Sequence, residues 1–156
     1  MEEISKALEE NFDPFVDAFV PSILRLCTRA NKVFVTCANN CLKIIITHSK
    51  TPSIIPFLHE ALHNPSKSLR TSASESLLTC FEIISPENLE SHIETIESAI
   101  RDGVVDVAPT VRDYCRKSFE MYRQYFPERI KMYFQISLIC NIYIPFPFLT
   151  FHDMHS

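Results

Sequence analysis

The chain carries the stretch NKVFVTCA at residues 31–38 and returns to it as SKSLRTSA at residues 66–73, 35 residues later. A third copy, PTVRDYC, follows at residues 109–115. Each copy comes after an apolar helical stretch and opens a second one, a pattern that is typical of helical hairpins stacked into a solenoid. The repeat therefore predicts an α-solenoid whose turns lie together along one edge.

The composition supports an all-α fold and excludes other classes of protein. Ten prolines but a single glycine, Gly103, occur in 156 residues, whereas a hairpin-rich β fold needs many glycines at its turns. The net charge of −4 disfavours a nucleic-acid-binding protein, which usually has a basic excess. The six cysteines form no CxxC pair and follow no signal peptide, so we expect reduced thiols and a cytosolic protein.

Apolar residues at helical spacing divide the chain into about three hairpins. We expect the turns inside them at residues 28–31, 64–68 and 102–109. Pro21 is expected to kink or divide the first of these helices. The opening helix at residues 4–12 has no partner before it, so the array is expected to begin in its middle.

The composition changes after residue 131. Residues 132–151 contain no charged side chain and mix aromatic residues with Ile, Leu and Pro. We therefore assign a repeat domain to residues 1–130 and an irregular apolar tail, of unassigned role, to residues 131–156. The tail is just long enough to span a membrane, but its prolines and amides disfavour that interpretation and favour a variant end of the domain or translated sequence from a truncated gene model.

His59-Glu60-Ala61-Leu62-His63 matches the H-E-x-x-H pattern of zinc metalloproteases. The helix that carries it stops at once at Asn64-Pro65, and no third ligand follows in a recognisable motif. The repeat places both histidines on the outer face of the helix. We interpret them as surface histidines and reject a protease.

No other cofactor or catalytic site is expected from the sequence. Cys37 and Cys41 are four residues apart and could join His48 at a metal, but the spacing matches no zinc module and core packing is favoured. With one glycine, the chain has no glycine-rich phosphate loop, and it has no nucleophile elbow. We expect a protein that is not an enzyme and holds no metal or cofactor.

Basic and polar residues recur at the turns. The candidate binding residues are Arg29, Asn31, Lys32, Lys67, Arg70 and Arg112. For Arg70 and Arg112 a structural role is equally open, because stacked repeats often pair such an arginine with a carboxylate of the neighbouring turn, for instance Asp106. Lys32 and Lys67 are the stronger candidates for binding an acidic protein surface.

Several motifs resemble one known family. They are FDPF at residues 12–15, VPSIL at 20–24, NKV at 31–33, IIPFLHEAL at 54–62, SKSLR at 66–70 and YFPER at 125–129. The chain resembles the N-terminal CLASP-type TOG domain, a HEAT-repeat module of microtubule-regulating proteins, over about residues 3–130. The resemblance implies about three HEAT-like hairpins, roughly half of a complete TOG domain.

The resemblance also implies a partner. In the family the turns inside each repeat contact αβ-tubulin, which would place Asn31 and Lys32 on the first tubulin-facing turn, Lys67 and Arg70 on the second, and Arg112 on the third. It implies a location in the cytoplasm, on microtubules and the spindle. The alternative is a generic HEAT-repeat scaffold that binds a protein or peptide unrelated to tubulin.

Overall fold

Three helical hairpins follow one another in the computed structural model, which describes residues 13–130. They pair α2 (Asp13–Leu26) with α3 (Lys32–Ser49), α4 (Ile55–Leu62) with α5 (Lys67–Ile83), and α7 (Ile93–Val104) with α8 (Pro109–Tyr125). Short helical turns connect the hairpins, namely η2 (Pro52–Ile54), α6 (Pro86–Leu89) and η3 (Glu90–His92). The described part of the chain contains no strand, and the predicted all-α solenoid is confirmed.

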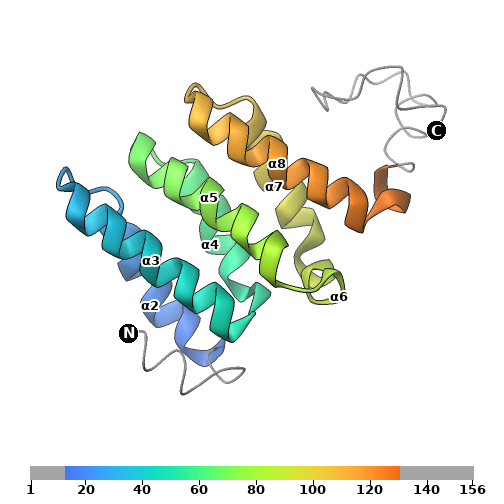
Figure 1. Cartoon of the computed structure of the whole chain (residues 1–156), viewed down its shortest axis with the longest axis horizontal. Coiled ribbons are helices and arrows are strands. Elements are labelled where there is room, and N and C mark those ends of the chain that lie inside the picture. Colours follow the sequence, from blue (N-terminus) through green and yellow to red (C-terminus); the bar gives the residue numbers. More distant parts are fainter. Residues whose placement is uncertain (1–12, 131–156) are drawn as a thin grey trace.

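The helices form two layers (Figure 1). The second helices of the hairpins, α3, α5 and α8, lie side by side in one layer, and the first helices, α2, α4 and α7, form the layer behind it. Each hairpin thus buries its apolar faces against its neighbours, as a single hairpin could not do alone.

One continuous core runs between the layers. The apolar residues of α3, α5 and α8 recur at the three- and four-residue spacing of a helix face. Their buried members are Ala38, Leu42, Ile45 and Ile46 on α3, Leu69, Ala73, Leu77 and Phe81 on α5, and Val111, Cys115, Phe119 and Tyr122 on α8. Val35, three residues before Ala38 on α3, is only half-buried.

The middle helix, α5, also buries small polar residues because it is flanked by α3 and α8. Ser74 and Thr79 are both buried. Their hydroxyls donate to the backbone carbonyls of Thr71 at 2.9 Å and Glu75 at 3.1 Å, within the same helix. This leaves neither of these two hydroxyls unsatisfied, so both residues can be buried at little polar cost.

The YFPER segment closes the third hairpin with a buried ion pair. Arg129 donates to both carboxylate oxygens of Glu97, at 2.9 and 3.0 Å, and the Tyr122 hydroxyl donates to the same carboxylate. The Glu97 side chain is only 3% exposed. Glu97 can be buried because Arg129 and Tyr122 satisfy its charge inside the fold.

Three further expectations concern local structure. Pro21 neither divides nor ends the first helix, since α2 continues through it to Leu26. Cys37 is exposed rather than in the core, whereas Cys41 packs partly against the core. The five cysteines within residues 13–130 are all free thiols.

Two expectations lie outside the described residues, namely the opening helix at 4–12 and the apolar tail at 131–156. The domain boundary at residue 130 therefore stays a prediction. Within residues 13–130, no helix combines the length and apolar character that crossing a bilayer requires.

Candidate functional site

The three turns inside the hairpins lie along one edge of the molecule (Figure 1). We call this edge the turn ridge and define it by residues 28–34, 64–70 and 105–112. Its helix starts are set by local capping chemistry. The Asn31 side chain accepts from the Val33 N–H at 2.9 Å, the Ser66 hydroxyl accepts from the Leu69 N–H at 3.4 Å, and Pro109 opens α8.

Four of the six predicted binding residues are exposed on the turn ridge. They are Arg29, Asn31, Lys32 and Lys67. Asn31 has a structural task as well, because its side-chain oxygen caps α3. Arg29, Lys32 and Lys67 therefore supply the accessible positive charge of the first two turns.

Arg70 does not project toward solvent. Its Nε and Nη2 donate to the two carboxylate oxygens of Asp106, at 2.7 and 3.2 Å, and its Nη1 donates to the carbonyls of Asn64 and Pro65, both at 3.0 Å. The side chains of Arg70 and Asp106 are only 11% and 10% exposed. This is the structural pairing that was left open for Arg70, and it joins the second turn to the third.

The charge state of Asp106 follows from the same contacts. Burial would raise the pKa of its carboxyl. The hydrogen bonds from Arg70 and from the Ala108 N–H, together with the nearby positive charge of Arg70 and Arg112, outweigh burial and hold the pKa below its ordinary value. Asp106 is thus a stable anion whose carboxylate anchors Arg70, while its backbone carbonyl accepts from Arg112.

Arg112 donates to the backbone of the third turn. Its Nη1 donates to the carbonyls of Asp106 at 2.8 Å and Val107 at 3.1 Å, and the residue is half-buried. Because these bonds hold the loop that precedes α8, the geometry favours a structural role for Arg112 as well. The third turn then contributes little free positive charge.

Apolar side chains on the turn ridge were missed at the sequence level. Val33 and Phe34 are 66% and 50% exposed at the start of α3, and Val105 and Val107 are 68% and 86% exposed in the third turn. A signal was available, because the first copy of the repeat has Val33-Phe34 where the second has Ser68-Leu69. The turn ridge therefore combines basic and apolar contacts, a mixture that suits a protein partner.

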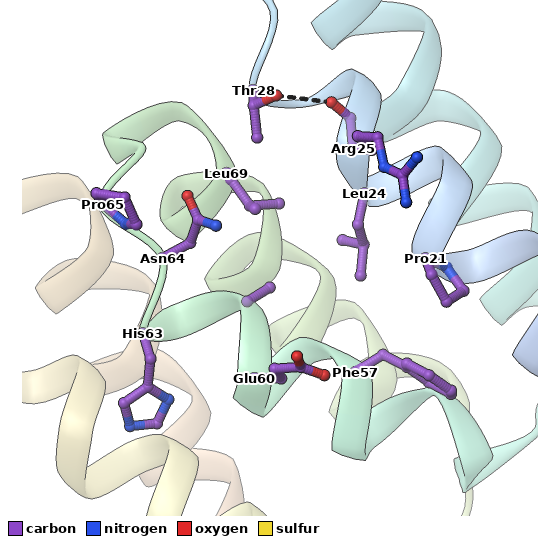
Figure 2. Close-up of a pocket in the computed structure, with 11 residues that line it drawn as sticks. Pro21, Leu24, Arg25, Thr28, Phe57, Glu60, His63, Asn64, Pro65 and Leu69 are labelled. Carbon is purple, nitrogen blue, oxygen red and sulfur yellow. Dashed lines mark hydrogen bonds between the residues drawn. The ribbon is translucent and has the colours of Figure 1, made fainter.

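A groove opens beside the first two turns (Figure 2). Its volume is about 600 Å³, and it lies between α2 and the α4–α5 hairpin. Leu24, Phe57 and Leu69 give it apolar walls, and Arg25 and Glu60 supply charge. The groove adds a concave surface next to the convex line of turns.

The family model described as CLASP N terminal matches residues 1–138. Protein peg1 of Schizosaccharomyces pombe is 28% identical over 133 residues, covering 81% of this chain and 9% of that protein. CLIP-associated protein of Arabidopsis thaliana is 26% identical over 133 residues, covering 84% and 9%.

A vertebrate protein is similar over the same small share of its length. CLIP-associating protein 1-B of Xenopus laevis is 23% identical over 131 residues, covering 84% of this chain and 9% of that protein. The chain thus spans about a tenth of the length of the relatives that it matches.

Proposed function

This chain belongs to the CLASP N-terminal family, and we propose that it is a tubulin-binding module that acts in the regulation of microtubule dynamics. The module binds αβ-tubulin or the microtubule through its turn ridge, and it acts in the cytoplasm, on microtubules and the spindle. It works by binding and not by catalysis.

The observation that carries this proposal is the turn ridge itself. Arg29 and Lys32 on the first turn and Lys67 on the second are exposed on one edge of a chain whose net charge is −4. Tubulin is an acidic partner, so a local line of positive charge steers the encounter and orients the complex. Val33 and Phe34, next to Lys32, supply the apolar contact that charge alone does not give.

We propose direct contacts for fewer than the six candidate residues. Arg70 and Arg112 hold the turns together through Asp106 and backbone carbonyls, so they act as positioning residues. Asn31 combines an exposed position with a capping role. Arg29, Lys32 and Lys67 are the direct contacts of the proposal.

The test is co-sedimentation of the full chain with microtubules, with gel filtration against free tubulin, at low and moderate salt. The double variant Lys32→Ala/Lys67→Ala removes two exposed charges, each worth about 0.2–1 kcal/mol in a solvent-exposed pair. We therefore expect affinity to fall about 2- to 30-fold, with a smaller difference at moderate salt.

The matched control is Lys43→Ala/Lys117→Ala. It makes the same charge change on exposed residues in the bodies of α3 and α8, away from the turns. If the control weakens binding as much as the turn variant, net charge and not the turn ridge governs association. If a helical Lys32→Ala/Lys67→Ala variant keeps full affinity, the assigned face is wrong.

A generic HEAT-repeat scaffold remains the second candidate, and the groove of Figure 2 is the observation that favours it. Such a scaffold would hold a peptide against Leu24 and Phe57 largely by apolar contact. This candidate would be supported over the first if the chain binds a peptide with an affinity that changes neither with salt nor with Lys32→Ala, and does not bind tubulin.

A further inference from the structure

Three potential metal ligands from two neighbouring hairpins meet at one point. His59 lies on α4, His63 is the C-cap residue four positions later, and Asp102 lies on α7. The Asp102 Oδ2 is 3.0 Å from the His59 Nε2 and 3.3 Å from the His63 Nε2. Within residues 13–130, this is the only group of three or more His, Cys, Asp or Glu side chains whose ligand atoms converge, all within 4.8 Å of one another.

The sequence interpretation of two separate surface histidines lacked this third residue. Asp102 is 43 residues after His59 and reaches it only because the α7 helix packs against α4. Cys37, Cys41 and His48, the other metal set considered, form no such group in the described residues.

One hydrogen bond fixes how His63 presents itself. Its Nδ1 lies 3.0 Å from the carbonyl oxygen of His59, and because a carbonyl can only accept, this nitrogen carries the proton. In the neutral ring the His63 Nε2 therefore offers a lone pair toward the Asp102 carboxylate. Two electron-rich atoms facing each other at 3.3 Å need a cation or a proton between them.

The distances suit a metal ion in that place. Ligand atoms about 2.0–2.1 Å from a tetrahedral zinc ion stand about 3.3–3.4 Å apart, close to the observed 3.0 and 3.3 Å, and the ligand atoms of all three side chains lie within 4.8 Å of one another. Two imidazoles and one carboxylate match the preference of zinc and related divalent ions. The side chains are 26%, 58% and 38% exposed for His59, His63 and Asp102, so solvent reaches the site and can fill the fourth position.

We propose that His59, His63 and Asp102 bind one divalent transition-metal ion of the zinc class, which joins the second hairpin to the third. The proposal does not rest on tubulin binding. The proposed site is structural and not that of a hydrolase, because Glu60, the general base of the H-E-x-x-H pattern, does not face it. Glu60 lines the groove, and Figure 2 shows its side chain turned toward Phe57 and away from the ring of His63.

The experiment is a calorimetric titration of Zn²⁺ into the full chain, purified without a polyhistidine tag and stripped with a chelator. All proteins carry Cys37→Ser, because an exposed thiol also binds zinc. We expect one ion per chain and a higher Tm in the presence of zinc, since the ion binds only the folded arrangement.

Two ligand variants and one control decide the outcome. His63→Ala and Asp102→Asn are expected to weaken zinc binding at least about tenfold and to remove the Tm increase. His48→Ala, which removes a histidine outside the group, leaves both unchanged. Circular dichroism without metal establishes that each variant is folded, and both ligand residues are partly solvent-exposed, which favours folding.

Cobalt reports the ligand type. Co²⁺ bound by imidazole and carboxylate lacks the intense sulfur-to-metal charge-transfer band that a thiolate ligand gives. The proposal is overturned if the chain takes up no zinc, if both ligand variants bind it as tightly as the parent, or if the cobalt spectrum shows sulfur. In the first case the three side chains form hydrogen bonds alone.

Discussion

Replacing Gly103 with alanine tests how closely the third hairpin is packed. Gly103 lies in the last turn of α7, where a Cβ would stand 2.1 Å from the Cys115 Sγ and 3.0 Å from its Cβ on α8. The first distance is far inside van der Waals contact, and Cys115 is fully buried, so the helices must move apart. Overpacking of this kind costs about 1–3 kcal/mol.

The intrinsic helix preference acts in the opposite direction. Alanine in a helix interior is favoured over glycine by about 1 kcal/mol. Taking the upper part of the overpacking range, we expect Gly103→Ala to lower the free energy of unfolding by about 2 kcal/mol, against about 1 kcal/mol for Cys115→Ala, which removes one buried sulfur atom. The double variant places the new methyl group where the sulfur was, so it is expected to lose only about 0–1 kcal/mol.

The assay is urea unfolding of the full chain followed by far-UV circular dichroism. The quantity of interest is the coupling between the two substitutions, expected to be about 2–3 kcal/mol. Gly103→Ala combined with Cys80→Ala is the matched control, because Cys80 is equally buried but lies on α5, and its effect is expected to add. The reasoning is refuted if Gly103→Ala is as stable as the parent or if the Cys115 pair is additive.

Three further outcomes follow from the described contacts. Arg129→Met should lower the free energy of unfolding by about 2–3 kcal/mol in urea, because it removes the cation, itself 32% exposed, that neutralises the buried Glu97 carboxylate. Arg123→Met, which breaks an exposed pair, should cost no more than about 0.5 kcal/mol. The folded pKa of Asp106 is depressed, so the stability that its carboxylate contributes is present above about pH 4, its unfolded pKa, and is lost as the pH falls further. The difference in unfolding free energy between the parent and Asp106→Asn should therefore shrink below that pH. A difference that stays constant there would contradict this. Burial raises the pKa of the Cys80 thiol to about 12, so mass spectrometry after native labelling at pH 8 should find Cys37 modified and Cys80 intact.

The hairpins and their turns could be predicted because their causes are local. A cap such as Asn31 or a proline such as Pro109 begins a helix within a few residues of itself, and the apolar stripe that follows repeats at a fixed spacing. The pairing of Arg70 with Asp106 could be anticipated for a related reason: both residues occupy turns, and a stacked repeat brings successive turns together.

The remaining features depend on packing between helices that sequence spacing does not encode. Glu97 looks like an exposed acidic residue until Arg129, 32 residues later, folds back onto it. Asp102 likewise meets His59 only across the α4–α7 contact. The exposure of Val33 could be recognised only by comparing the repeats, because its counterpart in the next repeat, Ser68, is polar.

The Arg70 bridge has a consequence for the energetics of association. Its guanidinium holds the carbonyls of its own turn and the Asp106 carboxylate of the next, so the spacing between the second and third turns is set before a partner arrives. A rigid surface loses little conformational entropy when it docks, and more of the contact energy then appears as affinity. In the proposed complex Arg70 would therefore strengthen binding without contacting the partner, and Arg70→Ala would weaken it by loosening the free protein.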